Sequence, residues 1–221
     1  MSLKQEANRI FCIAKDNAPM PGCTISKCIS ESDEPVIIYF SLAAKTDISA
    51  EIYECQKLIL CNSGDLIIYN LNNEEQKLGS RCCALLPKGK AVGMKSETSC
   101  VYTEIELKKG SIMNELLEAG KSLKLADLLD YKADSIVNTD IVKNDHLKLV
   151  IMAFDEGTGL TEHAAPGEAI IFALEGNGII GYEGSEHNIS AGQSFKFDKG
   201  GKHYVKADGR FKMALLIVYG D

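Results

Sequence analysis

The 221-residue chain is long enough for one large domain or for two domains of about 110 residues, which is near the commonest domain size. Its 45% hydrophobic and 25% charged residues are ordinary for a globular protein and exclude a disordered one. A formal net charge of −7 repels phosphate backbones and anionic lipid, so we expect neither nucleic acid nor a membrane among the partners.

The N-terminal segment lacks the apolar core of a signal peptide, and no run approaches the ~20 apolar residues of a membrane span. The eight cysteines all lie within the first 100 residues, and none forms a CxxC pair. We therefore expect a cytoplasmic protein whose thiols are reduced and behave as small core hydrophobes, rather than a disulfide framework or a zinc site.

In chain order, short apolar or alternating runs rich in Ile, Val, Tyr and Phe predict strands, and clusters of Gly, Asn, Asp and Ser between them predict turns. The segment 112–130 is the main helical candidate, but Gly120 interrupts its apolar period, so only short helical pieces are expected there. The predicted strand runs lie at 36–40, 57–61, 66–70, 83–87 and 101–107, and then at 147–154, 169–174, 178–182, 194–197 and 213–219.

The chain contains an internal repeat. Segment 35–68 lies over segment 147–180 at an offset of 112 positions, which places Gly64 on Gly176. Because the same offset holds over nearly the whole chain, we predict a duplicated all-β domain. The predicted boundaries are an N-terminal barrel at 1–112, a helical linker and lead-in at 113–138, and a C-terminal barrel at 139–221.

Two motifs in the later copy carry a family resemblance. The stretches GTGLTEHAAPGEAIIFALEGNG (157–178) and AGQSFKFDKGGKHYVKA (191–207) resemble the paired motifs of the cupin superfamily. His163 falls on the first histidine of the first motif, and His203 falls on the final histidine of the second. Gly200 also matches. The resemblance implies an all-β fold of two tandem cupin-type double-stranded β-helix (jelly-roll) barrels, which is a bicupin.

The motifs also depart from the family pattern. The resemblance implies that two histidines and a glutamate of the first motif, with the histidine of the second, hold one divalent metal ion inside the barrel. Here Ala165 stands at the second histidine, and Ala169 rather than Glu168 stands at the glutamate. Asp198 replaces the usual proline of the second motif. Two of the four ligand positions are therefore lost.

The earlier copy retains no ligand position of the family. Glu51, Tyr53, Lys57 and Val92 occupy the equivalent places once a single residue is gapped before Val92, and the first hundred residues contain no histidine. We therefore expect a structural role for this copy, such as covering a face of the later copy or contributing to a dimer interface.

The candidate site of the later copy contains two imidazoles. His163 and His203 are expected to converge in the barrel, with Phe195 and Phe197 lining an apolar cavity; core packing is the alternative for the two phenylalanines. A metal ion would need a third ligand, and a local bulge that turned Glu168 inward could supply it. The remaining histidines lie in polar turns and are expected to be solvated: His146 and His187.

Two functions from different classes follow from this site. The first is a small-molecule-binding protein with a partly lost metal centre, in which His163 and His203 form hydrogen bonds to an organic ligand. The second is a mononuclear metal-dependent enzyme, dioxygenase- or isomerase-like, in which the same histidines hold the metal ion. One divalent transition metal in the C-terminal barrel is the cofactor of the second hypothesis alone. A homodimer is expected with either function, because exposed edge strands of such barrels often pair.

Overall fold

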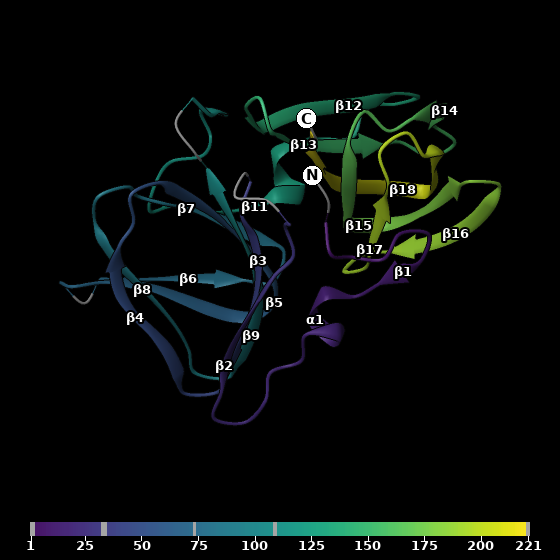
Figure 1. Ribbon diagram of the computed structural model, residues 1–221. Coiled ribbons are helices and arrows are strands. Elements are labelled where there is room, and N and C mark those ends of the chain that lie inside the picture. The colour runs from purple at the N-terminus through teal and green to yellow at the C-terminus, as the bar shows by residue number, and fades with distance from the viewer. Residues whose placement is uncertain (1–2, 32–34, 73, 108–109, 220–221) are drawn as a thin grey trace. The chain divides into compact units, whose positions relative to one another are not determined.

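The computed structural model describes residues 3–31, 35–72, 74–107 and 110–219 and is nearly all-β (Figure 1). Within these residues the chain forms 18 strands, one short α-helix and one 3-10 turn. The strands of the first half, with the helix, are β1 (Ile10–Phe11), α1 (Ile13–Asp16), β2 (Thr24–Cys28), β3 (Ile37–Ala43), β4 (Thr46–Ile52), β5 (Gln56–Asn70), β6 (Glu75–Gly79), β7 (Cys82–Leu86), β8 (Ala91–Ser96) and β9 (Ser99–Leu107). The remaining elements are β10 (Ile112–Met113), β11 (Ser122–Lys124), η1 (Leu125–Leu128), β12 (Ile136–Lys143), β13 (Leu147–Phe154), β14 (Gly159–Ala164), β15 (Glu168–Tyr182), β16 (Ser185–Ser190), β17 (Ser194–Phe197) and β18 (Lys202–Val218).

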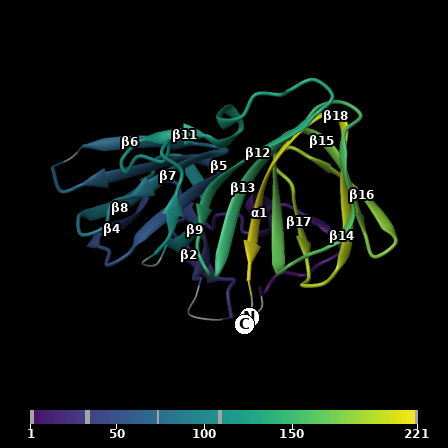
Figure 2. The same cartoon turned by 90° about the horizontal axis from the view of Figure 1, so that it is seen from above.

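The chain divides into two compact units, each with its own curled antiparallel sheet (Figure 2). In the C-terminal unit the strand order is β1-β17-β15-β18-β13-β12-β10, with β14 on β18 and β16 on β15. In the N-terminal unit it is β11-β7-β5-β9-β3-β2, with β6 and β8 on β5 and β4 on β8. The long strands β5, β15 and β18 each continue through a bend, so one strand serves both layers. The predicted fold class, two tandem jelly-roll barrels, is confirmed.

The repeat is visible in the strands themselves. β5 and β15 are both 15 residues long, and they begin at residues 56 and 168, which differ by the predicted 112 positions. β18, a strand of 17 residues, corresponds to β8 and β9 together. Each half therefore folds by the same hydrophobic alternation, in which every second residue of a strand faces the barrel interior.

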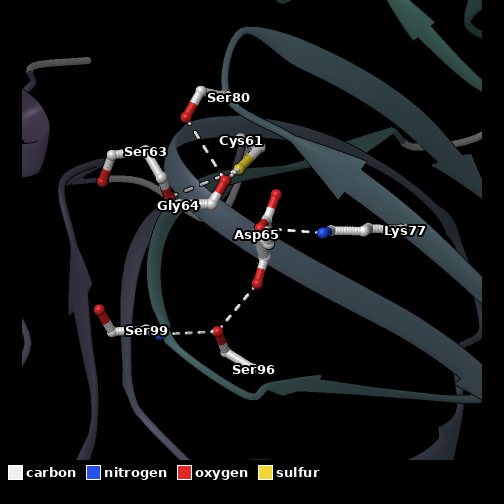
Figure 3. A network of polar contacts seen from close by, with 8 residues as sticks. All are labelled: Cys61, Ser63, Gly64, Asp65, Lys77, Ser80, Ser96 and Ser99. Atoms are coloured by element: carbon white, nitrogen blue, oxygen red, sulfur yellow. Dashed lines mark hydrogen bonds and ion pairs between the residues drawn. The ribbon is translucent and has the colours of Figure 1, made fainter.

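β5 and β15 each contain a glycine with positive φ next to a shift in strand register, and Figure 3 shows this corner in β5. Gly64 has a φ of +75°, and a Cβ there would lie 2.1 Å from the carbonyl oxygen of Ser99. Around it, the Ser80 hydroxyl donates to the Gly64 carbonyl at 3.4 Å, and the Ser96 hydroxyl donates to the Asp65 carbonyl at 2.8 Å. Because only glycine combines this φ with this close approach, the corner explains why the repeat keeps a glycine here.

The two compact units are discontinuous in sequence. The C-terminal unit comprises Met1–Cys12, Ile112–Asn114 and Leu125–Asp221, and the N-terminal unit comprises Ile13–Ser111 and Glu115–Lys124. β1 pairs with β17 through Ile10 opposite Phe195, so the N-terminal segment completes the later barrel. The domain limits 1–112, 113–138 and 139–221 stay a prediction. They follow the sequence repeat, whereas residues 1–12 and 112–114 belong to the C-terminal unit.

The short helical pieces expected in the connecting segment are represented by one 3-10 turn. Between residues 112 and 130 the helical structure among the described residues is the 3-10 turn η1, and the rest forms the short strands β10 and β11 and turns. β10 pairs with β12, and β11 pairs with β7. Pairing with an exposed sheet edge satisfies the backbone of this segment, which outweighs a helical preference weakened at Gly120.

The core of each unit lies on the inner face of its sheet. In the C-terminal unit the core includes Phe154, Phe211 and Met213, and in the N-terminal unit it includes Leu66 and Tyr102. The eight cysteines are free thiols, and Cys61, Cys83 and Cys100 are the buried ones. Among the described residues, no helix has the length and apolar character needed to cross a bilayer.

Candidate functional site

The two candidate histidines lie side by side in the C-terminal unit. His163 on β14 stands directly opposite His203 on β18, so both side chains project from the same face of the sheet. Their ring centroids are 4.2 Å apart, with the ring planes inclined at 53°. His163 is exposed and His203 is buried, so one imidazole of the pair lies at the surface of the barrel and the other lies in its interior. The structure thus brings these two predicted residues together.

Both imidazoles are oriented by their own backbone. His163 Nδ1 lies 2.8 Å from the carbonyl oxygen of Thr161, and His203 Nδ1 lies 3.0 Å from the carbonyl oxygen of Gly201. A carbonyl oxygen can only accept, so Nδ1 must carry the proton in each neutral ring. Each Nε2 is then an unprotonated acceptor, and no described residue donates to either. The pair therefore presents two nitrogen lone pairs.

Burial favours the neutral form of His203. Its side chain is stacked on Phe197, with 4.1 Å between ring centroids and 27° between planes. Burial lowers the pKa of His203 below its usual value; the contact with the Gly201 carbonyl opposes this shift, and the neighbouring His163 adds to it. At neutral pH His203 is accordingly an uncharged acceptor.

The two candidate phenylalanines belong to the barrel core. Phe195 and Phe197 are 0% and 1% exposed, and their rings pack against each other at 5.1 Å. Phe195 belongs to the hydrophobic core cluster, as core packing predicts, whereas Phe197 also stacks on the His203 ring. A ligand role for these residues stays a prediction, and Phe197 is the better placed of the two.

Glu168 does not join the histidines, and this corrects the expectation that a bulge would turn it inward. Its neighbour Ala169 faces the core opposite Phe197, so the alternation of the strand turns Glu168 to the other face of the sheet. There it lies 3.3 Å from the ammonium group of Lys196 and accepts a hydrogen bond from the backbone N–H of Leu3. Lys196 also contacts Asp198 at 2.8 Å. Glu168 anchors the N-terminal segment.

The donor set does not fit the metal ion that the family motif implies. Among the described residues no group of three or more His, Cys, Asp and Glu side chains is arranged to hold a metal ion. Ala165 and Ala169, at the lost ligand positions, are 4% and 3% exposed and face the core, so the surroundings of the pair are hydrocarbon. Two imidazoles fall one ligand short of the three that catalytic zinc and non-haem iron sites take from protein.

Two further residues lie near the candidate side chains and were not predicted to lie there. Tyr182 stands opposite His203 on β15 and packs against Phe197 at 5.5 Å, and its hydroxyl accepts from the Asp198 N–H. His187, expected to be solvated, is half-buried: it contacts the Phe195 ring at 5.0 Å, and its Nε2 pairs with the Asn8 side chain. The alternation of side chains along the strand could have predicted that Tyr182 lies near His203. The contact between His187 and Asn8 could not be predicted, because it depends on the N-terminal segment pairing with β17.

The equivalent register of the N-terminal unit holds different chemistry. Glu51 on β4 stands opposite Val92 on β8, as His163 stands opposite His203, which confirms the single-residue gap used to align the copies. All four histidines of the chain lie outside this unit. At the position that corresponds to Ala169, this barrel contains Lys57, whose ammonium lies 2.6 Å from Glu104 and 4.1 Å from the centre of the Tyr53 ring.

Comparisons with known proteins agree with this fold. Residues 150–219 match the family model of the cupin domain. Among solved structures, a cupin 2 conserved barrel domain protein from Leptotrichia buccalis is 22% identical with a TM-score of 0.86, over 99% of this chain and 100% of that chain. A salicylate 1,2-dioxygenase from Pseudoaminobacter salicylatoxidans is 9% identical with a TM-score of 0.65, over 99% and 83% of the two chains. An oxalate decarboxylase from Lactobacillus farciminis is 9% identical with a TM-score of 0.57, over 97% and 87%. No curated protein matches the chain.

The fold and the motif register define a protein of two tandem jelly-roll barrels with one histidine pair. Residues 150–219 of the C-terminal barrel match the cupin domain, and the similar solved structures have the same fold over nearly the whole chain. Two of the similar structures are enzymes by name, a dioxygenase and a decarboxylase, but at 9% identity they share only the fold with this chain.

Proposed function

We propose that this protein is a member of the cupin superfamily that binds a small organic molecule at the histidine pair of its C-terminal barrel, and that the metal centre of the family is partly lost. His163 and His203 accept hydrogen bonds from the ligand through Nε2, and Phe197 forms an apolar floor beside them. The protein is proposed to act in the cytoplasm as a homodimer. The proposal leaves the identity of the ligand open beyond this chemistry.

The observation that carries the proposal is the orientation of both rings. Each Nδ1 is committed to a backbone carbonyl, at 2.8 Å for His163 and 3.0 Å for His203, so two acceptors are presented together. Ligand sites are typically apolar surfaces with a few converging polar groups, and the pair beside Phe197 has that character. A ligand with hydroxyl or N–H donors on an apolar body suits it.

The alternative is a mononuclear metal-dependent enzyme that uses His163 and His203. One observation favours it: histidine ligands of metal ions commonly donate their other ring nitrogen to a backbone carbonyl, as both rings do here. Against it stands the donor set, because alanines replace the other two ligands and Glu168 is paired with Lys196. The substrate would have to supply the missing ligands.

Elemental analysis of untagged protein, purified without chelators, separates these functions. We expect well under one first-row transition metal per chain, together with saturable binding of phenol, used as a probe with one hydroxyl donor on an apolar ring. Toluene, which lacks the donor, should bind more weakly. The double variant His163→Ala/His203→Ala should weaken phenol binding roughly tenfold, since it removes the acceptors.

His187→Ala serves as the matched control, because it removes an imidazole of the same barrel whose Nε2 is already paired. Phenol binding should survive in this variant. One stoichiometric metal ion per chain that disappears in the double variant would favour the enzyme. Equal phenol affinity in all three proteins would remove the histidine pair as a binding site.

A further inference from the structure

The interior of the N-terminal barrel contains a buried charge cluster. We call it the Lys57 cluster and define it as Lys57, Glu104, Glu106, Tyr53 and Tyr102. The Lys57 ammonium lies 2.6 Å from Glu104 and 3.6 Å from Glu106, and the Tyr53 ring packs on it at 4.1 Å. The Glu104 side chain is 2% exposed, so this ion pair is removed from water. Removing two charged groups from water costs free energy, so a buried ion pair of this kind suggests a role beyond stability.

The members of the cluster converge because of strand register. Lys57 on β5 stands opposite Glu106 on β9, and Ile59, a core residue, stands opposite Glu104. Tyr102 lies two residues before Glu104 and belongs to the same core. Side chains two residues apart on a strand share a face, so all of these groups face the barrel interior.

The Tyr102 hydroxyl has no hydrogen-bond partner among the described residues, although the side chain is 0% exposed. Burial, and secondarily the nearby Glu104, raise the pKa of Tyr102 well above its usual value, so the group is a neutral phenol. A buried hydroxyl without a partner is destabilising, and in native proteins it generally marks a missing water, ion or ligand.

The charge of the cluster selects the kind of ligand. One ammonium faces two carboxylates, so the cluster has an excess of one negative charge when all three groups are ionised. Glu51, which lies across from Val92, adds a further carboxylate on the exposed side. Such surroundings attract a cation and repel an anion. The Glu106 side chain is 25% exposed, so the cluster can be reached from solvent.

We propose that the N-terminal barrel binds a small primary ammonium ion at the Lys57 cluster, between the carboxylates of Glu104 and Glu106 and the unpartnered hydroxyl of Tyr102. The ammonium donates to the phenolic oxygen and to a carboxylate, so the ligand completes the hydrogen bonding of the buried tyrosine. The N-terminal barrel is then a second binding unit. This site is independent of the histidine pair in the other unit.

Titration of the full chain with ethylammonium chloride, followed by amide chemical shifts, tests the proposal. We expect saturable shifts in β5 and β9, and no saturation with sodium acetate or with potassium chloride at equal ionic strength. Tyr102→Phe should weaken ethylammonium binding at least fivefold while leaving the melting temperature of the free protein unchanged or higher. Glu106→Gln, at the partly exposed side, should also weaken binding.

Tyr39→Phe is the matched control. Its hydroxyl is also buried without a partner among the described residues, but Tyr39 lies on the opposite face of β3 from the core residue Leu42. Ethylammonium binding should be unchanged in this variant. The proposal is overturned if no saturable binding is found, if potassium or acetate binds equally well, or if Tyr39→Phe and Tyr102→Phe have the same effect.

Discussion

Replacing Gly176 by alanine is expected to lower the free energy of unfolding by about 4 kcal/mol. The loss has two sources: the strain of a left-handed backbone conformation in alanine, and the steric clash of its Cβ. Gly176 has a φ of +72°, and a Cβ there would lie 1.8 Å from the carbonyl oxygen of Arg210. That oxygen is backbone and cannot rotate away, so β15 or β18 would have to move at the bend that joins the two layers. Urea unfolding followed by circular dichroism measures the loss.

Gly209→Ala provides the control for Gly176→Ala. Gly209 has a φ of +76°, but nothing lies within 4 Å of a Cβ built on it. Alanine at this position should lower the free energy of unfolding by only about 1 kcal/mol, because only the strain of the left-handed backbone conformation remains. If the two variants lost equal stability, the close approach at Gly176 would have no energetic weight and our account of the strand corner would be wrong.

Lys196→Met is expected to destabilise the protein by about 3 kcal/mol, the usual cost of removing one partner from a buried ion pair. The Lys196 side chain is 4% exposed and lies 3.3 Å from Glu168, whose side chain is 13% exposed. Methionine keeps the apolar stem but removes the positive charge that Lys196 places 3.3 Å from the Glu168 carboxylate. Chemical denaturation measures the change, and protection of the Leu3 amide from hydrogen exchange should fall with it.

Lys202→Met is the comparison for Lys196→Met, because Lys202 lies only six residues further along the chain but is exposed. Its substitution should change stability by less than about 0.5 kcal/mol. Phenol binding at the histidine pair should be the same in both variants. A Lys196→Met protein as stable as the parent would show that Glu168 needs no counter-charge, and its assignment as a structural anchor would fail.

The strands and the duplication could be predicted from sequence because they depend on local signals. Alternation of apolar residues identifies strands whatever their partners, and the repeat offset aligns β5 with β15. The approach of His163 and His203 followed from the motif register, since matched positions on neighbouring strands fix which side chains face one another.

The rest could not be predicted because it depends on contacts between distant segments. β1 reaches β17 across more than half the chain, and no local pattern reveals that pairing. The segment 112–130 pairs with sheet edges that exist only after both barrels fold. From the sequence, Lys57 was interpreted only as a replaced ligand position. Its ion pair with Glu104 could not be predicted, because the two residues are 47 positions apart and no local pattern connects them.

The central claim is that two unprotonated Nε2 atoms, one from His163 and one from His203, are presented together. A long-range proton–nitrogen correlation spectrum of histidine-labelled protein tests it, with single alanine variants for assignment and a pH at which the rings are neutral. We predict that both residues carry the proton on Nδ1 and that each Nε2 has the shift of an unprotonated nitrogen. A protonated Nε2 on either ring would contradict the claim and remove an acceptor on which the proposed ligand depends.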